Sequence, residues 1–395
     1  MKDLPAITVS NRTAHPRVPD VHPATHWGSE VKRILCVRLD NLGDILMTTP
    51  ALHALRGTTP GRHLTLLAST AGSAIAPLLP DVDEVIRYDA PWVKHPPCLG
   101  SDTPIWEMLA AGRFDAAVIF TVYSQNPLPA AMLCHLAGIP RRLAHCRENP
   151  YALLTHWAPE TEPECGTRHE VLRQLALVER VGAHVDDARM HLVVPAADAA
   201  TVEVKLAARG IDIDVPLLVV HPGATAPSRR YPVERFAQAA EHIIESLGCT
   251  VIVTGDESER PLGDQFQRTC PRAHNFIGLL SLAELCALIK GAQVLVSNNS
   301  GPVHIASALC TPVVDLYALT NPQHGPWQTP HRLLFEDVEC RWCYRSVCTE
   351  GHHRCLTGVS FEAVVDAVHA LWSQSQRRRP AAQPAGLVLS PPHPL

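Results

Sequence analysis

The chain has 395 residues, of which 46% are hydrophobic and 18% charged, and its formal net charge is −5. This composition is typical of a packed globular protein and excludes wholesale disorder, and the acidic balance gives no general attraction to nucleic acid or anionic lipid. Because one hydrophobic core rarely organises so long a chain, we expect two domains with a cleft between them.

The two ends of the sequence differ from the rest. Residues 1–31 are rich in Pro, Thr and His, and residues 376–395 in Pro and Arg, so both are expected to be disordered tails. The sequence holds neither an apolar signal segment nor a run of 18 apolar residues, which predicts a cytoplasmic protein without a transmembrane segment. The odd number of cysteines, 13, favours reduced thiols over a disulfide framework.

Short apolar runs alternate with helical patterns in the first half of the chain. This alternation is typical of a parallel sheet with crossover helices, and it predicts a first Rossmann-like domain over residues 32–190. Strands are predicted at 33–39, 64–68, 84–88 and 116–120, and helices at 43–56, 127–138 and 169–183.

The same pattern restarts after a Pro- and Asp-containing stretch near 190–215, which we take as the domain boundary. Residues 191–375 should then form a second doubly wound α/β domain that faces the first across the cleft, with a last helix packing back across both. Strands are predicted at 216–223, 250–255, 275–279, 294–299 and 312–317, and helices at 233–247, 259–269, 281–290, 301–309 and 361–373.

The first motif with chemical potential is the turn after the first predicted strand. Residues 37–56 read VRLDNLGDILMTTPALHALR, so Asp44 lies on the first turn of a helix at the carboxyl edge of the sheet, where ligands of open α/β sheets bind. Asp44 could act on a ligand there or serve only as a helix cap. Asp40 is the rival carboxylate.

The second motif is HPGATAPSRRYPVERF, residues 221–236, in which a strand leads through a loop into a helix. Thr225, Ser228 and Arg229 supply hydroxyl groups and positive charge in a loop with free backbone N–H groups, which suits a diphosphate. An ordinary loop with solvated arginines is the alternative.

The third motif, SNNSGPVHIASALCTPVV at residues 297–314, is another strand, turn and helix. Gly301 would let a phosphate approach the backbone, and His304 lies on the first helical turn at the same end. A lone histidine is more often structural, but two phosphate-competent loops in one domain favour a nucleoside diphosphate.

Other motifs are absent from the sequence or weak. It contains no GxGxxG after the first strand and no GxxxxGK[ST], which argues against a dehydrogenase and a P-loop phosphotransferase. The DVD at Asp81 to Asp83 is similar to a metal-binding DxD, but it precedes a short strand and is expected to be a solvated turn.

Four segments together resemble glycosyltransferase family 9, the ADP-heptose:lipopolysaccharide heptosyltransferases. They are RLDNLGD…TTPAL, HPGA…RRYP, TGDESER and NSGP-x-H, and the resemblance spans roughly residues 32–375. It implies a GT-B fold with the acceptor on the N-terminal domain and the sugar nucleotide on the C-terminal domain. It also implies inverting transfer, in which a base deprotonates the acceptor hydroxyl.

By position, the resemblance makes Asp44 the catalytic base and Arg229 a basic residue facing the donor phosphates. Glu259 matches an acidic residue near the adenosine ribose, with Glu257 as its rival. The expected donor-side residues are Thr225, Ser228, Arg229, Glu259, Asn299, Ser300, Gly301 and His304, and the expected acceptor-side residues are Asn41, Leu42 and Gly43.

The chain departs from the family where many heptosyltransferases carry Asp-Ser/Thr-Gly, because it has Asn299-Ser300-Gly301. The expected reaction is heptose transfer from ADP-heptose to a lipopolysaccharide core acceptor, without a required cofactor or metal. The acceptor would be a lipid-linked glycan at the inner membrane surface, with peripheral membrane contact left open and nucleic acid excluded as a partner. A related transferase with another nucleotide sugar, or a non-catalytic sugar-nucleotide-binding protein, are the alternatives.

A cysteine-rich loop, residues 340–355, reads CRWCYRSVCTEGHHRC. Four thiols have the ligand count of a structural zinc site, although their spacing is compressed relative to a zinc ribbon. Structural zinc, free thiols and disulfides all stay open as interpretations. The candidate ligands are Cys340, Cys343, Cys348 and Cys355.

Overall fold

The computed structural model describes residues 26–93 and 104–378. Most of the two predicted tails lies outside these residues. Residues 26–31, which composition assigned to the N-terminal tail, belong instead to the first domain, because Trp27 and Val31 are buried in its core. The Trp27 N–H donates to the Val181 carbonyl at 3.1 Å and ties this segment down.

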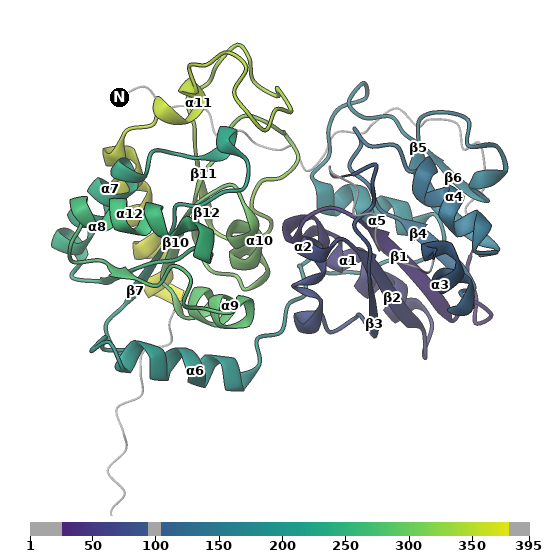
Figure 1. Cartoon of the computed structure of the whole chain (residues 1–395), viewed down its shortest axis with the longest axis horizontal. Helices are drawn as coiled ribbons and strands as arrows, with labels where there is room; N and C mark the ends of the chain where they lie inside the picture. The colour runs from purple at the N-terminus through teal and green to yellow at the C-terminus, as the bar shows by residue number, and fades with distance from the viewer. Residues whose placement is uncertain (1–25, 94–103, 379–395) are drawn as a thin grey trace, which may run out of the picture.

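Two parallel sheets form the framework, one in each half of the chain (Figure 1). The first has the strand order β3-β2-β1-β4-β5-β6 and the second the order β12-β11-β10-β7-β8-β9. Both orders are that of the dinucleotide-binding fold, in which a ligand crevice forms at the carboxyl ends of the two central strands. The central strands are β1 and β4 in the first sheet and β7 and β10 in the second.

The strands of the first sheet are β1 (Arg33–Arg38), β2 (His63–Ala68), β3 (Glu84–Arg87), β4 (Ala116–Ile119), β5 (Arg141–Cys146) and β6 (His156–Pro159). Those of the second are β7 (Leu217–His221), β8 (Thr250–Val253), β9 (His274–Asn275), β10 (Val294–Asn298), β11 (Val313–Leu316) and β12 (His331–Leu334).

The helices of the first half are α1 (Leu42–Thr58), α2 (Thr70–Ser73), α3 (Ile105–Ala111), α4 (Leu128–Leu136) and α5 (Glu170–Glu179). Those of the second half are α6 (Ala196–Ala207), α7 (Val233–Leu247), α8 (Arg260–Thr269), α9 (Leu282–Gly291), α10 (Gly301–Ala308), α11 (Arg354–Thr357) and α12 (Phe361–Arg378). Short 3₁₀ turns are η1 (Ala76–Leu78), η2 (Tyr151–Leu153), η3 (Pro227–Arg229) and η4 (Glu257–Glu259).

Local sequence explains most of these elements. All five residues of β10, VLVSN, are buried, as expected for a strand covered by helices on both faces. Helix α7 buries Phe236, Ala240 and Ile243 at helical spacing, and it ends where Gly248 adopts a left-handed φ of 60°.

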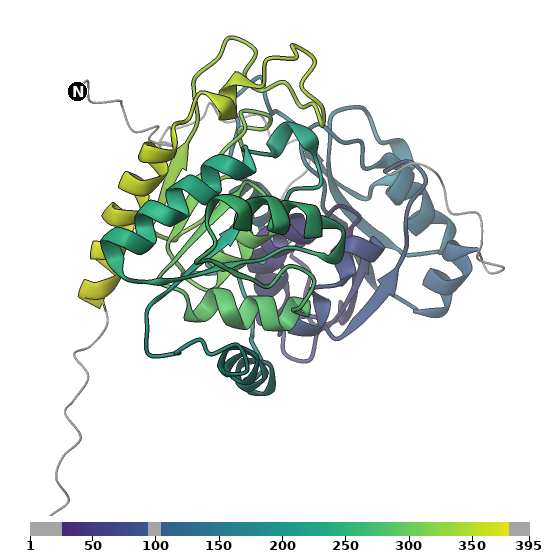
Figure 2. The same cartoon turned by 60° about the vertical axis from the view of Figure 1, so that its left-hand side comes forward.

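Two helices lie elsewhere than the sequence suggested. The stretch near 190–215 contains α6, which packs against α9 of the second domain. The last helix, α12, was expected to pack across both domains, but it lies beside α7 and on β10, β11 and β12 (Figure 2). Its buried side chains, among them Val364, Val368 and Trp372, all join the core of the second domain.

The two domains meet where α1 contacts α10. A Cβ on Gly43 would lie 2.5 Å from His304 Cδ2, so only glycine lets the first turn of α1 come this close to α10. The loop before β12 adds a second contact, because Trp327 stacks on His169 with ring centroids 4.5 Å apart. Within residues 26–93 and 104–378, no helix has the length and apolarity needed to cross a membrane.

Candidate active site

The site begins at Arg38, the last residue of β1, where the first sheet has its switch point. Its guanidinium is fully buried and reaches three carboxylates: Nε lies 3.1 Å from Asp40, Nη2 3.3 Å from Asp44 and Nη1 3.0 Å from Glu170. A buried guanidinium requires such partners, because an unpaired charge in the protein interior is very costly. Arg38 therefore gathers both candidate bases around one cation.

Asp44 occupies the first turn of α1, as its motif predicts. One carboxylate oxygen accepts the Asn41 N–H at 3.1 Å, so the capping role is real, while the other faces Arg38. Burial opposes ionisation of Asp44, but the charge of Arg38 and the hydrogen bond from the Asn41 N–H outweigh it and hold the pKa of the carboxyl below its ordinary value. Asp44 is thus an ionised, nearly buried carboxylate at neutral pH.

The rival Asp40 is in a different state. Its carboxylate accepts a hydrogen bond from Gln125 Nε2 at 2.6 Å and pairs with Arg38. Burial nevertheless raises the pKa of Asp40 to about 6, and the charge of Asp44 adds to the shift. Since two neighbouring carboxylates compete for one guanidinium, their pKa values separate, and Asp44 keeps the charge.

Two histidines of the second domain face Asp44 across the domain boundary. His324 Nε2 lies 4.0 Å from Asp44 Oδ1, and His304 packs against Gly43 from the first turn of α10. Burial lowers the pKa of both imidazoles, that of His304 to about 3, so both are neutral. His304 Nδ1 and His324 Nε2 are buried without a hydrogen-bond partner, which leaves two polar atoms available to a ligand beside Asp44.

Arg229 comes from η3, in the loop after β7, on the second domain. Its Nη2 donates to Asn321 Oδ1 at 3.0 Å, and the side chain is half-buried. Arg230 is exposed, with its Nε donating to the Ala224 carbonyl at 2.7 Å. Of the two arginines in the RRYP motif, Arg229 is the one that lies near α10. Its positive charge helps to lower the pKa of His304 on that helix.

The two hydroxyl residues of the same loop differ in their surroundings. Thr225 is exposed. Ser228 is buried, and its Oγ donates to the Arg345 carbonyl at 2.6 Å while its own carbonyl contacts His353 Nε2 at 2.6 Å. Ser228 therefore joins this loop to the cysteine-rich loop.

Glu259 lies at the carboxyl edge of the second sheet. Its carboxylate accepts the Asp256 N–H at 3.0 Å and fills the space beside two glycines, since a Cβ on Gly223 or Gly255 would overlap it. Glu257, by contrast, is exposed and pairs with Arg260 at 2.5 Å. The structure thus brings Glu259, and not Glu257, to the ends of β7 and β8.

The three expected residues of the turn after β10, which are Asn299, Ser300 and Gly301, have different surroundings. Ser300 Oγ donates to the Asn298 carbonyl at 3.1 Å, and a Cβ on Gly301 would lie 3.4 Å from Leu42 Cδ2 of the first domain. Asn299 is buried, and its amide donates to Asp315 Oδ2 at 2.8 Å and to the His324 carbonyl at 3.0 Å. Burial raises the pKa of Asp315 to about 8. The amide of Asn299 thus links the loop of His324 to β11, and its N–H donors are already engaged.

The expected acceptor-side residues are Asn41, Leu42 and Gly43. Asn41 is exposed at the start of α1, whereas Leu42 and Gly43 lie against α10. None of these three residues lines the cavity of about 270 Å³ that opens on the first domain. This cavity lies beside Gln125, the hydrogen-bond partner of Asp40. It is lined by Tyr123, Ser124, Gln125, Asn126, His145, Arg147, Glu148, Glu160 and Pro163.

The cysteine-rich loop encloses a small cavity of about 60 Å³ that all four candidate thiols line. Cys340 Sγ lies 3.7 Å from His352 Nε2. The twelve cysteines among the described residues are free thiols, so the disulfide interpretation is not realised there.

Sequence reasoning missed four residues that shape the site: Arg38, Glu170, Asn321 and His324. An arginine inside an apolar strand run is itself a signal, because such a residue is seldom buried without carboxylate partners. No comparable signal marks the other three, since loops and tertiary contacts bring them to the site.

Two solved structures share this architecture. A glycosyl transferase family 9 protein from Veillonella parvula has a TM-score of 0.74 at 21% identity, covering 89% of this chain and 100% of the other. The ADP-heptose lipopolysaccharide heptosyltransferase II of E. coli has a TM-score of 0.68 at 21% identity, covering 87% and 99%. Two Rossmann-like domains of this topology, together with these two structural neighbours, define a GT-B fold.

Sequence comparison gives the family. The family model of glycosyltransferase family 9 (heptosyltransferase) matches residues 103–353. The lipopolysaccharide heptosyltransferase 2 of Salmonella typhimurium is 23% identical over 354 residues, which cover 87% of this chain and 99% of that protein. The chain belongs to glycosyltransferase family 9.

Proposed function

We propose that this glycosyltransferase transfers a heptose from ADP-heptose to a lipopolysaccharide core acceptor, with inversion at the anomeric carbon and with Asp44 as the general base. The observation that carries the proposal is the ionised Asp44, held by Arg38 at 3.3 Å where α1 meets α10. The relatives at the level of sequence and structure include enzymes named as heptosyltransferases, which supports the donor.

In the proposed step, the acceptor hydroxyl attacks the anomeric carbon and gives its proton to Asp44 as the new C–O bond forms. The bond to the ADP oxygen breaks, and ADP leaves with the electron pair. A base of low pKa suffices, because the hydroxyl becomes acidic only as it bonds to an oxocarbenium-like carbon.

The leaving diphosphate gains negative charge, and the second domain offers groups to stabilise it. Arg229 supplies a cation, and the N-terminus of α10 supplies the positive end of its helix dipole. His304 Nδ1 and His324 Nε2 are free to bond the donor between them. One well-placed donor at a developing charge is usually worth about 3 kcal/mol, so these groups suffice without a metal ion.

Glu259 suits the ribose of the nucleoside, because its carboxylate stands at the ends of β7 and β8 with one oxygen engaged by Asp256. On the other domain, the cavity beside Gln125 suits part of the acceptor. Arg147 on its wall would bind an anionic group of a lipid-linked glycan.

A related reaction with another nucleotide sugar is the second candidate, and Asn299 is the observation that favours it. Where many heptosyltransferases have an acidic residue, this chain has an amide whose donors are occupied by Asp315 and His324. A non-catalytic binding protein would fit best if Asp44 lay away from the second domain, but it lies 4.0 Å from His324.

The test is product formation from ADP-heptose and core-deficient lipopolysaccharide, followed by mass spectrometry. We expect a mass increase of one heptose with the native chain and none with Asp44→Asn. A parallel incubation with UDP- and GDP-hexoses tests the donor, and a hexose adduct without a heptose adduct would overturn the proposal in favour of the second candidate. If neither donor gives a product while ADP still binds, the non-catalytic reading prevails.

A further inference from the structure

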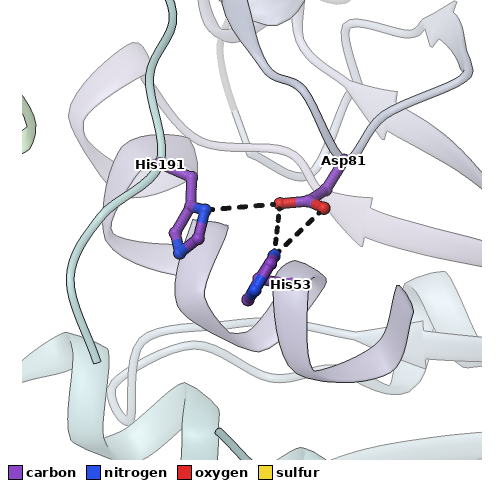
Figure 3. Close-up of side chains that lie close together, drawn as sticks. All are labelled: His53, Asp81 and His191. Atoms are coloured by element: carbon purple, nitrogen blue, oxygen red, sulfur yellow. Dashed lines mark hydrogen bonds and ion pairs between the residues drawn. The ribbon is translucent and has the colours of Figure 1, made fainter. Parts of the chain in front are cut away.

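A cluster of two histidines and one aspartate lies outside the proposed active site (Figure 3). His53 comes from α1, Asp81 from the turn before β3, and His191 from the segment that links the two domains. Their ligand atoms all lie within 4.8 Å of one another. His53 follows Asp44 by nine residues on α1, which is about 13 Å along the helix axis, so the cluster is separate from the chemistry.

We propose that His53, Asp81 and His191 form a binding site for a divalent transition metal ion such as Zn²⁺, which fastens the interdomain linker to α1. Two imidazoles and one carboxylate are the ligands that such ions prefer, whereas Mg²⁺ and Ca²⁺ prefer oxygen alone. Three protein ligands leave a fourth position for water.

The distances fit this assignment. Zinc bonds to nitrogen and oxygen are about 2.0–2.2 Å long, so neighbouring ligand atoms of a tetrahedral site lie about 3.3–3.5 Å apart. His53 Nδ1 is 3.1 Å from Asp81 Oδ2, and His191 Nδ1 is 3.7 Å from the same oxygen. Both imidazoles turn Nδ1 toward the carboxylate, and the rings stack with their centroids 4.0 Å apart. Only small movements would place an ion among the three atoms.

The backbone holds these ligands in place independently of an ion. The His191 N–H donates to Thr49 Oγ1 on α1 at 2.9 Å, and the Val193 N–H donates to the Leu78 carbonyl at 2.9 Å. The side chain of Asp81 is only 12% exposed, while that of His53 is 44% exposed, which opens a path for an ion from solvent.

The proposed metal site uses only Asp81 of the two aspartates in the DVD sequence, so it is not a DxD motif. Asp83 turns to Arg56 and to the Leu64 N–H, so the two aspartates do not share an ion. Asp81 was expected in a solvated turn, but it is nearly buried between two histidines. The bound ion would therefore tie the linker to the first domain and would not contact the donor.

Titration of the metal-free full chain with Co²⁺, followed by visible absorption, tests the proposal. We expect one equivalent to bind with the d–d bands of nitrogen and oxygen ligands and without a thiolate charge-transfer band. His191→Ala and His53→Ala should each weaken this binding at least tenfold, whereas His135→Ala, an exposed histidine on α4, should leave it unchanged. Binding in Cys343→Ser should also be unchanged, which separates the cluster from the cysteine-rich loop.

Thermal unfolding of the same proteins gives a second readout. A metal ion that binds only the folded chain raises its Tm, so Zn²⁺ should stabilise the native chain and His135→Ala but not His53→Ala. The metal-free Tm shows whether each variant is folded, and His191→Gln replaces His191→Ala if that variant is not. Equal Co²⁺ binding in the native chain and both histidine variants, only a thiolate-type spectrum, or no binding would each overturn the proposal.

Discussion

Arg38 Nη2 lies 3.3 Å from Asp44 Oδ1, so the proposed base rests on a guanidinium that is itself fully buried. The same cation pairs with Asp40 and Glu170 and lowers the pKa of Asp44, while burial raises the pKa of Asp40 to about 6. Arg38 therefore favours the ionised form of both carboxylates, but burial outweighs it at Asp40.

Asp44→Asn should keep the fold and the affinity for ADP but lower turnover by about 10²- to 10⁴-fold, the usual contribution of a general base. The amide can still accept the Asn41 N–H, so the start of α1 is preserved. Steady-state kinetics measures the loss of turnover, and calorimetry measures the affinity for ADP.

The pH dependence of kcat/KM separates the two aspartates. If Asp44 is the base, activity should fall only below the ordinary pKa of an aspartate, because the pKa of Asp44 is lowered. An acid limb near the Asp40 pKa of about 6, together with loss of turnover in Asp40→Asn, would move the role to Asp40.

Arg38→Gln should destabilise the chain by about 3–5 kcal/mol, because it leaves buried carboxylates without their cation. The control is Arg189→Gln, whose 2.7 Å pair with Asp187 is exposed and worth at most about 1 kcal/mol. Urea unfolding followed by circular dichroism measures both. Equal losses would mean that the cluster adds nothing beyond an ordinary surface pair.

Much of this architecture was predictable from the sequence, for identifiable reasons. Local sequence pattern predicts the apolar strands β1, β7 and β10 and the amphipathic helix α7. The predicted bounds of α7 are those observed. Strand β5 was missed because RRLAHC begins with two arginines, yet Arg142 is buried by donating to the backbone carbonyls of Leu153 and Ala152.

The site shows the same division between local and long-range information. The position of Asp44 on a helix turn follows from neighbours in sequence. The approach of His304 and His324 depends on how two domains pack, and the cluster of His53, Asp81 and His191 joins residues up to 138 positions apart. No local pattern contains those contacts.

Arg229→Ala should weaken ADP binding by about tenfold or more, since charge-assisted bonds to phosphate contribute about 1.5–3 kcal/mol. Arg230→Ala is the matched control, because Arg230 is the exposed neighbour in the same motif and should change affinity little. Calorimetry with ADP decides the matter. A strong effect at Arg230 with none at Arg229 would reverse the assignment.

Transfer should continue in EDTA, because Arg229, the N-terminus of α10 and neutral histidines meet the charge of the leaving diphosphate. Elemental analysis before and after chelation should accompany the assay, because zinc in the cysteine-rich loop or on His53 would alter thermal stability without stopping the reaction. Activity that EDTA abolishes and Mg²⁺ or Mn²⁺ restores would show a catalytic metal.

Asp315→Asn should change how stability depends on pH. Burial raises the pKa of Asp315 to about 8, whereas an aspartate in the unfolded chain titrates near about 4. The folded chain therefore retains a proton that the unfolded chain loses, so the stability due to this group is fully present below about pH 4 and is lost as pH rises toward 8.

An amide at position 315 imitates the protonated carboxyl. Its oxygen can accept from Asn299 Nδ2, as Asp315 Oδ2 does at 2.8 Å, and its NH₂ takes the place of Oδ1, which has no hydrogen-bond partner. Native and variant chains should have similar free energies of unfolding near pH 4. Above that pH the variant should gain relative to the native chain by up to about 1.4 kcal/mol per pH unit until about pH 8. Parallel free-energy profiles from urea unfolding at pH 5 to 8 would mean that Asp315 is ionised in the folded chain, and Asn299 would then be bonded to a charged carboxylate.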